Sequence, residues 1–466
     1  MSKSQPNTQL EVLTAYGQAH LATLAMHTAD DAERMLGIAE SLFKRRDAWL
    51  AKHERIAILK KLTSLMSEQV EALAMTIARE GGKPLKDARV ESERAVDGVE
   101  KTIEALAHLN GSEIPMGLTP AAANKLAFSY REPIGVVVAV SAFNHPLNLI
   151  IHQVIPAVAA GCPVIVKPAS TTPLSCLKVA ELLAKAGLPD GWCQVCICDN
   201  TVATQLVTDS RLGFFSFIGS ARVGWQLRSQ LAPGVRCALE HGGVAPVIVD
   251  NTADIEAMIP NLTKGGFYHA GQVCVSVQRV FVPKAMAEDI VGKLAKAAEQ
   301  LVVGDPTQAD TDVGPLILPR EVDRIDEWVQ EAVQQGARLV TGGKKLANGC
   351  YTPTVLLDPP EQAKVSTLEV FGPVVCVYSY QTIDKAVQRA NSLNVAFQAA
   401  VFSSDLQQSM KVMQQLDASA VMLNDHTAFR VDWMPFAGRR HSGLGTGGIG
   451  YTMHDMTQEK MFVLSL

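Results

Sequence analysis

IGVVVAV, residues 134–140, is an unbroken apolar run rich in β-branched side chains. Such a run predicts a strand that is buried on both faces, as strands are in parallel sheets. The next residues, SAFNHPLN (141–148), are mostly polar or turn-forming, so Asn144 should lie just beyond the carboxyl end of this strand. Parallel sheets place their ligand sites at that edge. We therefore predict an α/β fold with a functional site that begins near Asn144.

Strand-like and helix-like segments alternate downstream of this run, which predicts βαβ units and a doubly wound sheet. The first series of strand-like segments is PVIVK (163–167), WCQVCIC (192–198), GFFSF (213–217), RCALE (236–240) and APVIV (245–249). A second series between Cys274 and about Asn424 contains VQRVFV, RLVTG, PVVCVYSY and AAVFSS. Upstream, the pattern from Glu11 to about Leu109 predicts helices throughout.

Composition excludes several classes of function. The 466 residues suggest two or three domains, and 47% hydrophobic with 19% charged residues is typical of a globular protein. The net charge of −5 includes no basic block, so nucleic acid is not an expected partner. The amino terminus lacks a secretory signal, and prolines and polar residues interrupt the most apolar window (149–166), so no membrane span is expected. Nine cysteines without a signal peptide indicate reduced thiols and a cytoplasmic protein.

Two local patterns resemble ligand motifs but lack the required context. Cys193, Cys196 and Cys198 form a CxxCxC cluster, yet no matching Cys or His pair follows at zinc spacing, so we expect a buried strand and no metal. GTGGIG (445–450) matches a dinucleotide fingerprint but has neither a buried strand before it nor a βαβ unit after it. We interpret it as a flexible loop near the carboxyl terminus.

Four strand-end or turn segments each allow two interpretations. Asn144 could cap a helix or donate an N–H to an oxyanion. Lys167 could be a solvated charge or bind ribose hydroxyls. The Gly219-Ser220 turn into a helix could be an ordinary Gly-Ser turn or could receive a phosphate. Glu240 could be an exposed loop charge or a general base whose pKa is raised in an apolar pocket.

Cys274 raises the same question in FYHAGQVCVSVQRV (267–280). A free cysteine is usually a small buried hydrophobe, so this residue either packs or reacts. The residues around it do not decide between these possibilities.

The order and spacing of these motifs resemble the NAD(P)-dependent aldehyde dehydrogenase superfamily over nearly the whole chain. Eight segments of this chain are similar to patterns of that family. They are Asn144 with Lys167-Pro168, FIGSARVG (217–224), EHGG (240–243), GQVC (271–274), the set Glu369, Phe371, Gly372 and Pro373, PFAGRRHSG (435–443), EGGKPL (80–85) and REPIGV (131–136).

The resemblance implies oxidation of an aldehyde to a carboxylic acid with NAD or NADP. Cys274 would attack as a thiolate made available by a lowered pKa, forming a thiohemiacetal and then a thioester. The Asn144 amide and the Cys274 backbone N–H would stabilise the oxyanion. Glu240 would activate the water that releases the acid.

The resemblance also implies the cofactor contacts. Lys167 would bind a ribose, Glu369 would bind the nicotinamide ribose, and Phe371 would pack against the nicotinamide. The turn that contains Gly219, Ser220 and Gly224 would bind the phosphates. The remaining contacts would be Ser170 and Phe143, at whose position many members carry Trp. NAD-preferring members often carry Glu at the position of Ser170, where a carboxylate would repel a 2′-phosphate. We therefore hypothesise that the protein uses NADP.

Alternatives to this function remain. Relatives that transfer the acyl group to coenzyme A lack the base at Glu240, so its presence favours release of the free acid. A non-catalytic structural or binding protein would not need Cys274, Glu240 or Asn144. A cysteine hydrolase would need a His base paired with the cysteine, and the sequence around His269 does not indicate that role.

The substrate is less defined. Arg430 and His145 are candidate substrate contacts, and Arg430 would suit a small, polar or anionic aldehyde. The alternative is that Arg430 pairs with Asp432 or another surface acid. His241 replaces the usual Leu beside Glu240, and it would either tune that base or point at solvent.

The predicted architecture is two doubly wound, Rossmann-like parallel-sheet domains with a small β oligomerisation arm. Residues 1–115 and 132–242 would form the NAD(P)-binding domain and residues 243–435 the catalytic domain. Residues 116–131 and 436–466 would form the bridging arm, through which family members pair as homodimers or homotetramers.

Overall fold

The run at 134–140 lies at the centre of a six-stranded sheet in the computed structural model, which describes residues 8–466. In spatial order the strands are β19 (Gly443–Leu444), β9 (Arg236–Glu240), β8 (Leu212–Ile218), β5 (Val136–Val140), β6 (Val164–Lys167) and β7 (Cys193–Val195). All neighbours pair in parallel except β19, which is antiparallel to β9. The parallel sheet predicted from the sequence is confirmed, and its carboxyl edge carries Asn144.

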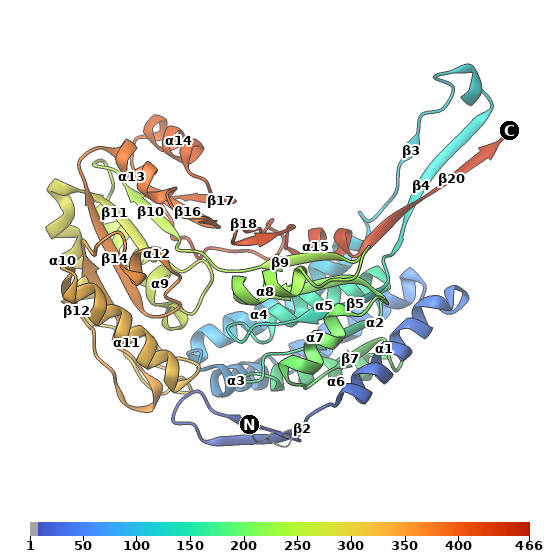
Figure 1. Ribbon diagram of the computed structural model, residues 1–466, viewed down its shortest axis with the longest axis horizontal. Coiled ribbons are helices and arrows are strands. Elements are labelled where there is room, and N and C mark those ends of the chain that lie inside the picture. Colours follow the sequence, from blue (N-terminus) through green and yellow to red (C-terminus); the bar gives the residue numbers. More distant parts are fainter. Residues whose placement is uncertain (1–7) are drawn as a thin grey trace.

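A second, seven-stranded sheet forms the other large lobe (Figure 1). Its strands, in spatial order, are β12 (Arg338–Thr341), β13 (Thr354–Leu357), β14 (Val374–Tyr380), β11 (Arg279–Pro283), β10 (Pro246–Val249), β16 (Gln398–Phe402) and β17 (Ala420–Leu423). Only β12 is antiparallel to its neighbour, β13. The expectation of two doubly wound domains is confirmed, each with one antiparallel strand at an edge.

Helices cover both sheets. Those of the first lobe are α1 (Ala29–Lys44), α2 (Lys52–Ser67), α3 (Val70–Gly81), α4 (Leu85–Leu106), α5 (Asn148–Ala160), α6 (Leu174–Ala186), α7 (Asn200–Thr208) and α8 (Ala221–Arg228). Those of the second are α9 (Ile255–Phe267), α10 (Ala287–Glu299), α11 (Pro319–Gln334), α12 (Lys364–Thr367), α13 (Ile383–Ala390) and α14 (Leu406–Gln415). Within the described residues, no helix combines the length and apolar content needed to cross a bilayer.

The prediction of helices throughout 11–109 is wrong at its start. β1 (Gln9–Leu13) and β2 (His20–Ala25) form an antiparallel hairpin below the first lobe. Gly17 and Gln18, with φ of +73° and +55°, form the turn between them, a conformation that no α-helix accommodates.

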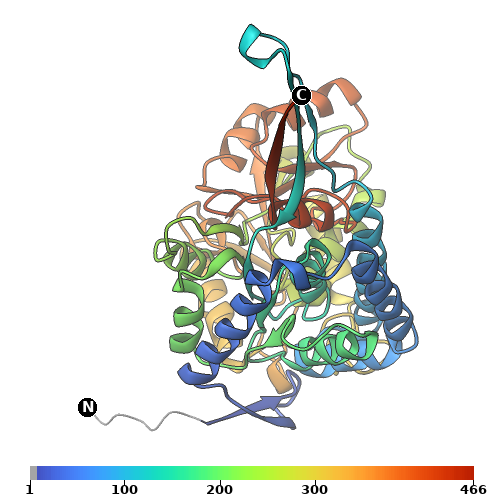
Figure 2. The same cartoon turned by 90° about the vertical axis from the view of Figure 1, so that its right-hand side faces the viewer.

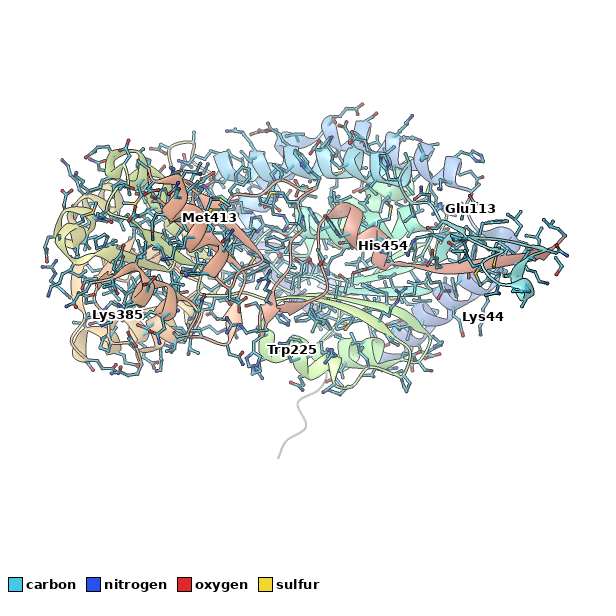
Figure 3. All side chains as sticks on the ribbon, turned by 90° about the horizontal axis from the view of Figure 1, so that it is seen from above. Lys44, Glu113, Trp225, Lys385, Met413 and His454 are labelled. Carbon is cyan, nitrogen blue, oxygen red and sulfur yellow. The ribbon has the colours of Figure 1, made fainter. Side chains whose placement is uncertain are left out.

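An arm of three strands projects from the first lobe: β3 (Glu113–Ile114), β4 (Lys125–Pro133) and β20 (Thr457–Ser465). Figure 2 shows the loop between β3 and β4 reaching beyond the rest of the chain. From above, Glu113 lies near this end of the molecule and Lys385 and Met413 near the other (Figure 3).

Part of the predicted arm belongs elsewhere, since 436–456 lie outside these three strands. β19 joins the first sheet, β18 (Arg439–Arg440) pairs with β15 (Val395–Ala396), and α15 (Ile449–Asp455) packs on α4 and α5. GTGGIG (445–450) is therefore no loose loop: Gly447 and Gly448 are buried and the segment leads into α15. The domain boundaries otherwise stay predictions, and residues 1–7 of the first domain lie outside the described residues.

A buried glutamate connects an amino-terminal helix to the turn after β5. Glu91 of α4 accepts hydrogen bonds from the backbone N–H groups of Leu147 and Asn148, at 3.0 and 3.1 Å, where α5 begins. It also forms an ion pair with Lys83, and both side chains are almost completely buried. This pair fixes the turn that carries Asn144.

Replacing Lys83 by Met should lower the free energy of unfolding by about 3–5 kcal/mol, because it leaves the Glu91 carboxylate buried without its cation. Urea denaturation followed by circular dichroism measures this change. The double variant K83M/E91Q should recover much of the loss. Lys86→Met is the matched control: Lys86 pairs with Asp312 at the surface, where a pair contributes at most about 1 kcal/mol. Equal effects of K83M and K86M would contradict the argument.

Candidate active site

A cavity of about 1230 Å³ collects most of the residues predicted from the sequence. Its lining includes Phe143, Asn144, His145, Ser170, Gly219, Ser220, Glu240, Cys274, Glu369, Phe371 and Arg430. Lys167 and Gly224 are not part of this lining. The carboxyl edge of the first sheet thus opens into one space shared with loops of the second lobe.

Asn144 joins the first sheet to the cysteine loop. It is buried just beyond β5, and its Nδ2 donates a hydrogen bond to the carbonyl of Gln272 at 2.9 Å. Gln272 is itself fixed, since its Nε2 donates to the Pro315 carbonyl at 3.2 Å and its Oε1 accepts from the Ile317 N–H at 2.9 Å. The Asn144 carboxamide is therefore held two residues from Cys274.

Cys274 follows a tightly constrained turn. His269 and Ala270 have φ of +49° and +53°, and Gly271 has φ of +67° with the Gly372 carbonyl 2.1 Å from where a Cβ would stand. Only glycine fits at 271. Both ring nitrogens of His269 are buried without a partner, so His269 is not the paired base that a cysteine hydrolase would need.

The electrostatics of Cys274 differ from the expectation of a lowered thiol pKa. Burial, followed by the nearby Glu369 and Glu240 carboxyls, raises the pKa of the Cys274 thiol, and Arg430 acts in the opposite direction. Removing water and adding negative neighbours both disfavour a thiolate. These effects keep the thiol protonated at neutral pH.

Glu240, the last residue of β9, is not an exposed loop charge. It lines the cavity, and burial raises the pKa of its carboxyl to about 7, with Arg430 opposing the shift. A Cβ on Gly447 would lie 2.0 Å from Glu240 Oε1, so the carboxyl rests directly against that glycine. A carboxyl with this pKa can take up and release a proton near neutrality.

Helix α8 supplies an open amino terminus for an anion. The helices that follow the other strands are capped by acids: Glu91 at α5, Glu80 at α6 with N–H bonds of 2.8 and 2.9 Å, and Asp199 at α7. Ser220, the N-cap of α8, makes no side-chain capping bond in the described structure. The Gly219 N–H is not free, because it donates to the Glu240 carbonyl at 3.0 Å, so the first turn of α8 provides the N–H groups for a phosphate.

His241 neither points at solvent nor contacts the carboxyl of Glu240. It is buried, its Nδ1 lies 2.8 Å from the Gly219 carbonyl, and its ring packs against those of Phe217 and Trp225. A Cβ on Gly224 would lie 2.1 Å from the His241 ring, so Gly224 shapes the site from behind the lining. His241 thus connects the end of β9 to the phosphate turn.

Lys167 is also behind the lining. It is buried at the end of β6, its Nζ donates to the Pro168 carbonyl at 3.3 Å, and burial lowers its pKa. Ser170 is exposed and does line the cavity, as does Arg222 of α8, which the sequence reasoning missed although it lies inside FIGSARVG.

Glu369 and Phe371 lie on the other wall. Burial raises the pKa of the Glu369 carboxyl to about 8, and its Oε1 is buried without a hydrogen-bond partner. This unpaired acceptor suits a ligand hydroxyl. The Phe371 ring meets that of Phe143 edge-on at 5.8 Å.

Arg430 does not pair with Asp432. The Arg430 guanidinium stacks on Phe436, with Cζ 3.6 Å from the ring centroid. Asp432 instead binds Arg94 and His152, each at 2.7 Å. His145 lines the same end, with its Nε2 3.4 Å from the Tyr268 hydroxyl. Arg94 and His152 were missed because no motif marks them.

Comparisons with known proteins agree with this geometry. The sequence pattern of the aldehyde dehydrogenase family matches residues 1–462. A 3-sulfolactaldehyde dehydrogenase of Priestia aryabhattai is 37% identical over 98% of this chain and 95% of that protein. The structure of aldehyde dehydrogenase 21 from Physcomitrella patens with the reaction product succinate is similar over 100% of this chain and 96% of that one, with 33% identity and a TM-score of 0.94. An NADP-dependent glyceraldehyde-3-phosphate dehydrogenase of Bacillus halodurans, complexed with NADP, matches at 30% identity over 98% of this chain and 96% of that one, with a TM-score of 0.94.

The raised thiol pKa makes Cys274 slow to alkylate at neutral pH. The rate of its modification by iodoacetamide should keep rising from about pH 7 to beyond about pH 9, because only the thiolate reacts. Peptide mass spectrometry separates Cys274 from the other cysteines. Arg430→Gln should slow the reaction further, whereas Arg324→Gln, which also changes the cavity lining but acts on Glu369, should not. A plateau below about pH 8 would contradict the raised pKa.

Proposed function

The chain belongs to the aldehyde dehydrogenase family, and from this premise we propose that it oxidises a short anionic aldehyde to the free acid through Cys274. Its relatives make it an NAD(P)-dependent oxidoreductase. The observation that carries the mechanistic proposal is that Cys274, Asn144 and Glu240 line one cavity, with the Asn144 amide already bonded to the cysteine loop.

In this mechanism Cys274 loses its thiol proton to solvent and its sulfur attacks the aldehyde carbon as a thiolate. The carbonyl oxygen becomes an oxyanion, which the Asn144 Nδ2–H and the Cys274 backbone N–H stabilise. Bound NAD(P)+ supplies the hydride acceptor. The resulting thioester is then attacked by water, whose proton Glu240 removes, and the acid leaves as the Cys274 thiolate returns.

Residues of this chain fit the cofactor. The first turn of α8 offers N–H groups and a positive dipole end to the phosphates, and the unpaired Glu369 Oε1 offers an acceptor to ribose hydroxyls. Phe143 and Phe371 supply apolar surface for a ring. Lys167 needs to change rotamer to reach a ribose, because its Nζ now bonds to Pro168.

Release to water rather than to coenzyme A follows from Glu240. A carboxyl with a pKa of about 7 inside the cavity is a base that can activate water at neutral pH. An enzyme that transfers the acyl group to a thiol must instead keep activated water away from the thioester.

The part of the cavity lined by Arg430 favours an anionic substrate. Arg430 faces the cavity, and within the described residues its guanidinium forms no ion pair with a carboxylate. The relatives include enzymes named for 3-sulfolactaldehyde and aspartate semialdehyde, and a structure that holds succinate. We therefore place an acid group of the substrate against Arg430, with His145 on the wall beside it.

Glu240→Gln should separate acylation from deacylation. We expect a burst of NAD(P)H of about one per active site and then a steady rate lower by about two to four orders of magnitude, because water is no longer activated. Stopped-flow absorbance measures both phases. In the wild type the steady rate should fall as pH drops through about 7, since the raised pKa means that Glu240 becomes protonated there and loses its base form.

Cys274→Ser is the control, and it should abolish the burst itself. Acid formation by C274S at the wild-type rate would overturn the role of Cys274. A burst in the wild type followed by turnover only when coenzyme A is added would overturn the role of water.

NADP is the cofactor that the site favours. Ser170 offers no carboxylate to repel a 2′-phosphate, and the cation Arg222 lines the same cavity. Ser170→Glu should therefore lower the ratio of kcat/KM for NADP to that for NAD by at least about tenfold, because a like-charge contact costs several kcal/mol. Steady-state kinetics with both cofactors measure the ratio, and Ser170→Ala should move it far less. A wild type that strongly prefers NAD, with a ratio unchanged in S170E, would refute the assignment.

We also propose a homodimer or homotetramer in the cytoplasm. The strand β20 exposes Met461, Phe462, Val463 and Leu464 on the projecting arm, and a partner subunit would cover this apolar surface. All nine cysteines are free, which suits a reducing compartment.

A further inference from the structure

A buried network stands behind Arg430. Its centre is Asp432, in the loop after β17, with a side chain only 2% exposed. Asp432 accepts two hydrogen bonds from Arg94 of α4, at 2.7 and 3.1 Å, and two from α5: one from Asn148 Nδ2 at 3.1 Å and one from His152 Nε2 at 2.7 Å. The Asp432 carboxylate is thus bonded to Arg94, Asn148 and His152, and not to Arg430.

The network determines which nitrogen of His152 carries a proton. An ionised carboxylate only accepts hydrogen bonds, so the His152 Nε2 that contacts Asp432 must be the N–H. Burial raises the pKa of Asp432, but the bonds from His152 and Arg94 outweigh it and keep the group ionised. Burial lowers the pKa of His152, so its ring is neutral and Nδ1 is a free acceptor.

That acceptor faces Arg430. His152 Nδ1 lies 3.4 Å from Arg430 Nη2, while the face of the guanidinium rests on Phe436. One edge of Arg430 is therefore held by a neutral acceptor and one face by an aromatic ring. Since Arg94 already balances the charge of Asp432, the positive charge of Arg430 acts on the cavity, which it shares with the Glu240 carboxyl.

We propose that His152, itself oriented by Asp432, is a positioning residue that aims the Arg430 guanidinium at the acid group of an anionic aldehyde. This inference rests on the proposed function, and it adds that selectivity for the acid group depends on how His152, which lines the same cavity, holds Arg430. An acceptor that is neutral holds Arg430 without neutralising it. A carboxylate in its place would cancel the charge that the substrate requires.

The test compares two aldehydes of equal chain length, 4-oxobutanoate and butanal, which differ in the acid group. His152→Leu removes both ring contacts. We expect the ratio of kcat/KM for 4-oxobutanoate to that for butanal to fall by about tenfold, the effect of losing one hydrogen bond to a charged group, and most of the change to lie in the KM for 4-oxobutanoate. His152→Gln, whose amide carries a donor and an acceptor on one planar group, should restore much of the ratio.

His27→Leu is the matched control, because it removes a half-buried imidazole that bonds to the Ile197 backbone away from the cavity. It should leave the ratio unchanged. Thermal unfolding identifies a variant that fails to fold. If H152L fails to fold, His152→Asn takes its place, because its shorter amide cannot reach both Asp432 and Arg430. A ratio shifted toward butanal in H152N, with a higher KM for 4-oxobutanoate, supports the proposal, and an unshifted ratio refutes it.

Equal losses on both aldehydes in H152L, or the same shift in H27L, would overturn the positioning role. A wild type that forms NAD(P)H with neither aldehyde nor with any other would instead refute the proposed function. A wild type that uses butanal as well as 4-oxobutanoate would refute the anion subsite itself.

Discussion

The hydrogen bond from Asn144 Nδ2 to the Gln272 carbonyl is the contact on which the rest of the site depends. Its donor follows the central strand of the first sheet, and its acceptor belongs to the second lobe. The bond forms only because Gly271 permits a close approach of backbone at Gly372 and because Gln272 is tied to the 315–317 segment. Without it, the loop of the oxyanion donor and the loop of the nucleophile would be joined mainly by the contacts of the His145 ring with Tyr268 and His269.

Burial of charge sets the chemistry within this frame. The carboxyls of Glu240 and Glu369 and the thiol of Cys274 share one cavity, and loss of water raises the pKa of all three. For Glu240 this is useful, because a pKa of about 7 makes it a base at neutral pH. For Cys274 the raised pKa disfavours the reactive thiolate, and Arg430 offsets this effect only in part. An oxidised nicotinamide ring would bring positive charge that acts in the same direction as Arg430, so the thiol would become reactive only in the assembled complex.

Sequence reasoning succeeded where local pattern and site coincide. The apolar runs around 134–140, 164–167 and 213–217 could only be buried parallel strands, and their ends therefore located the cavity. It failed at the hairpin 9–25, whose short alternating strands lie before a long helical stretch. Contacts made by tertiary packing were also out of reach: no motif indicates that Lys167 folds back onto Pro168, or that His241 fits between two aromatic rings against Gly224. Arg94 and His152 meet Arg430 only through the packing of α4 and α5.

The acid caps of the first lobe distinguish α8 from the other helices that follow strands of its parallel sheet. A helix amino terminus attracts an anion through its free N–H groups and its dipole. Glu91 and Glu80 provide that anion at α5 and α6, and by doing so they tie the amino-terminal helices α4 and α3 to the sheet. Asp199 does the same at α7. Of the four helices that follow β5, β6, β7 and β8, three thus have amino termini capped by acids of the protein itself, and α8, beside Glu240 and His241, has no such side-chain cap within residues 8–466. The turn into α8 is also tied to the end of β9, because the Gly219 N–H donates to the Glu240 carbonyl at 3.0 Å.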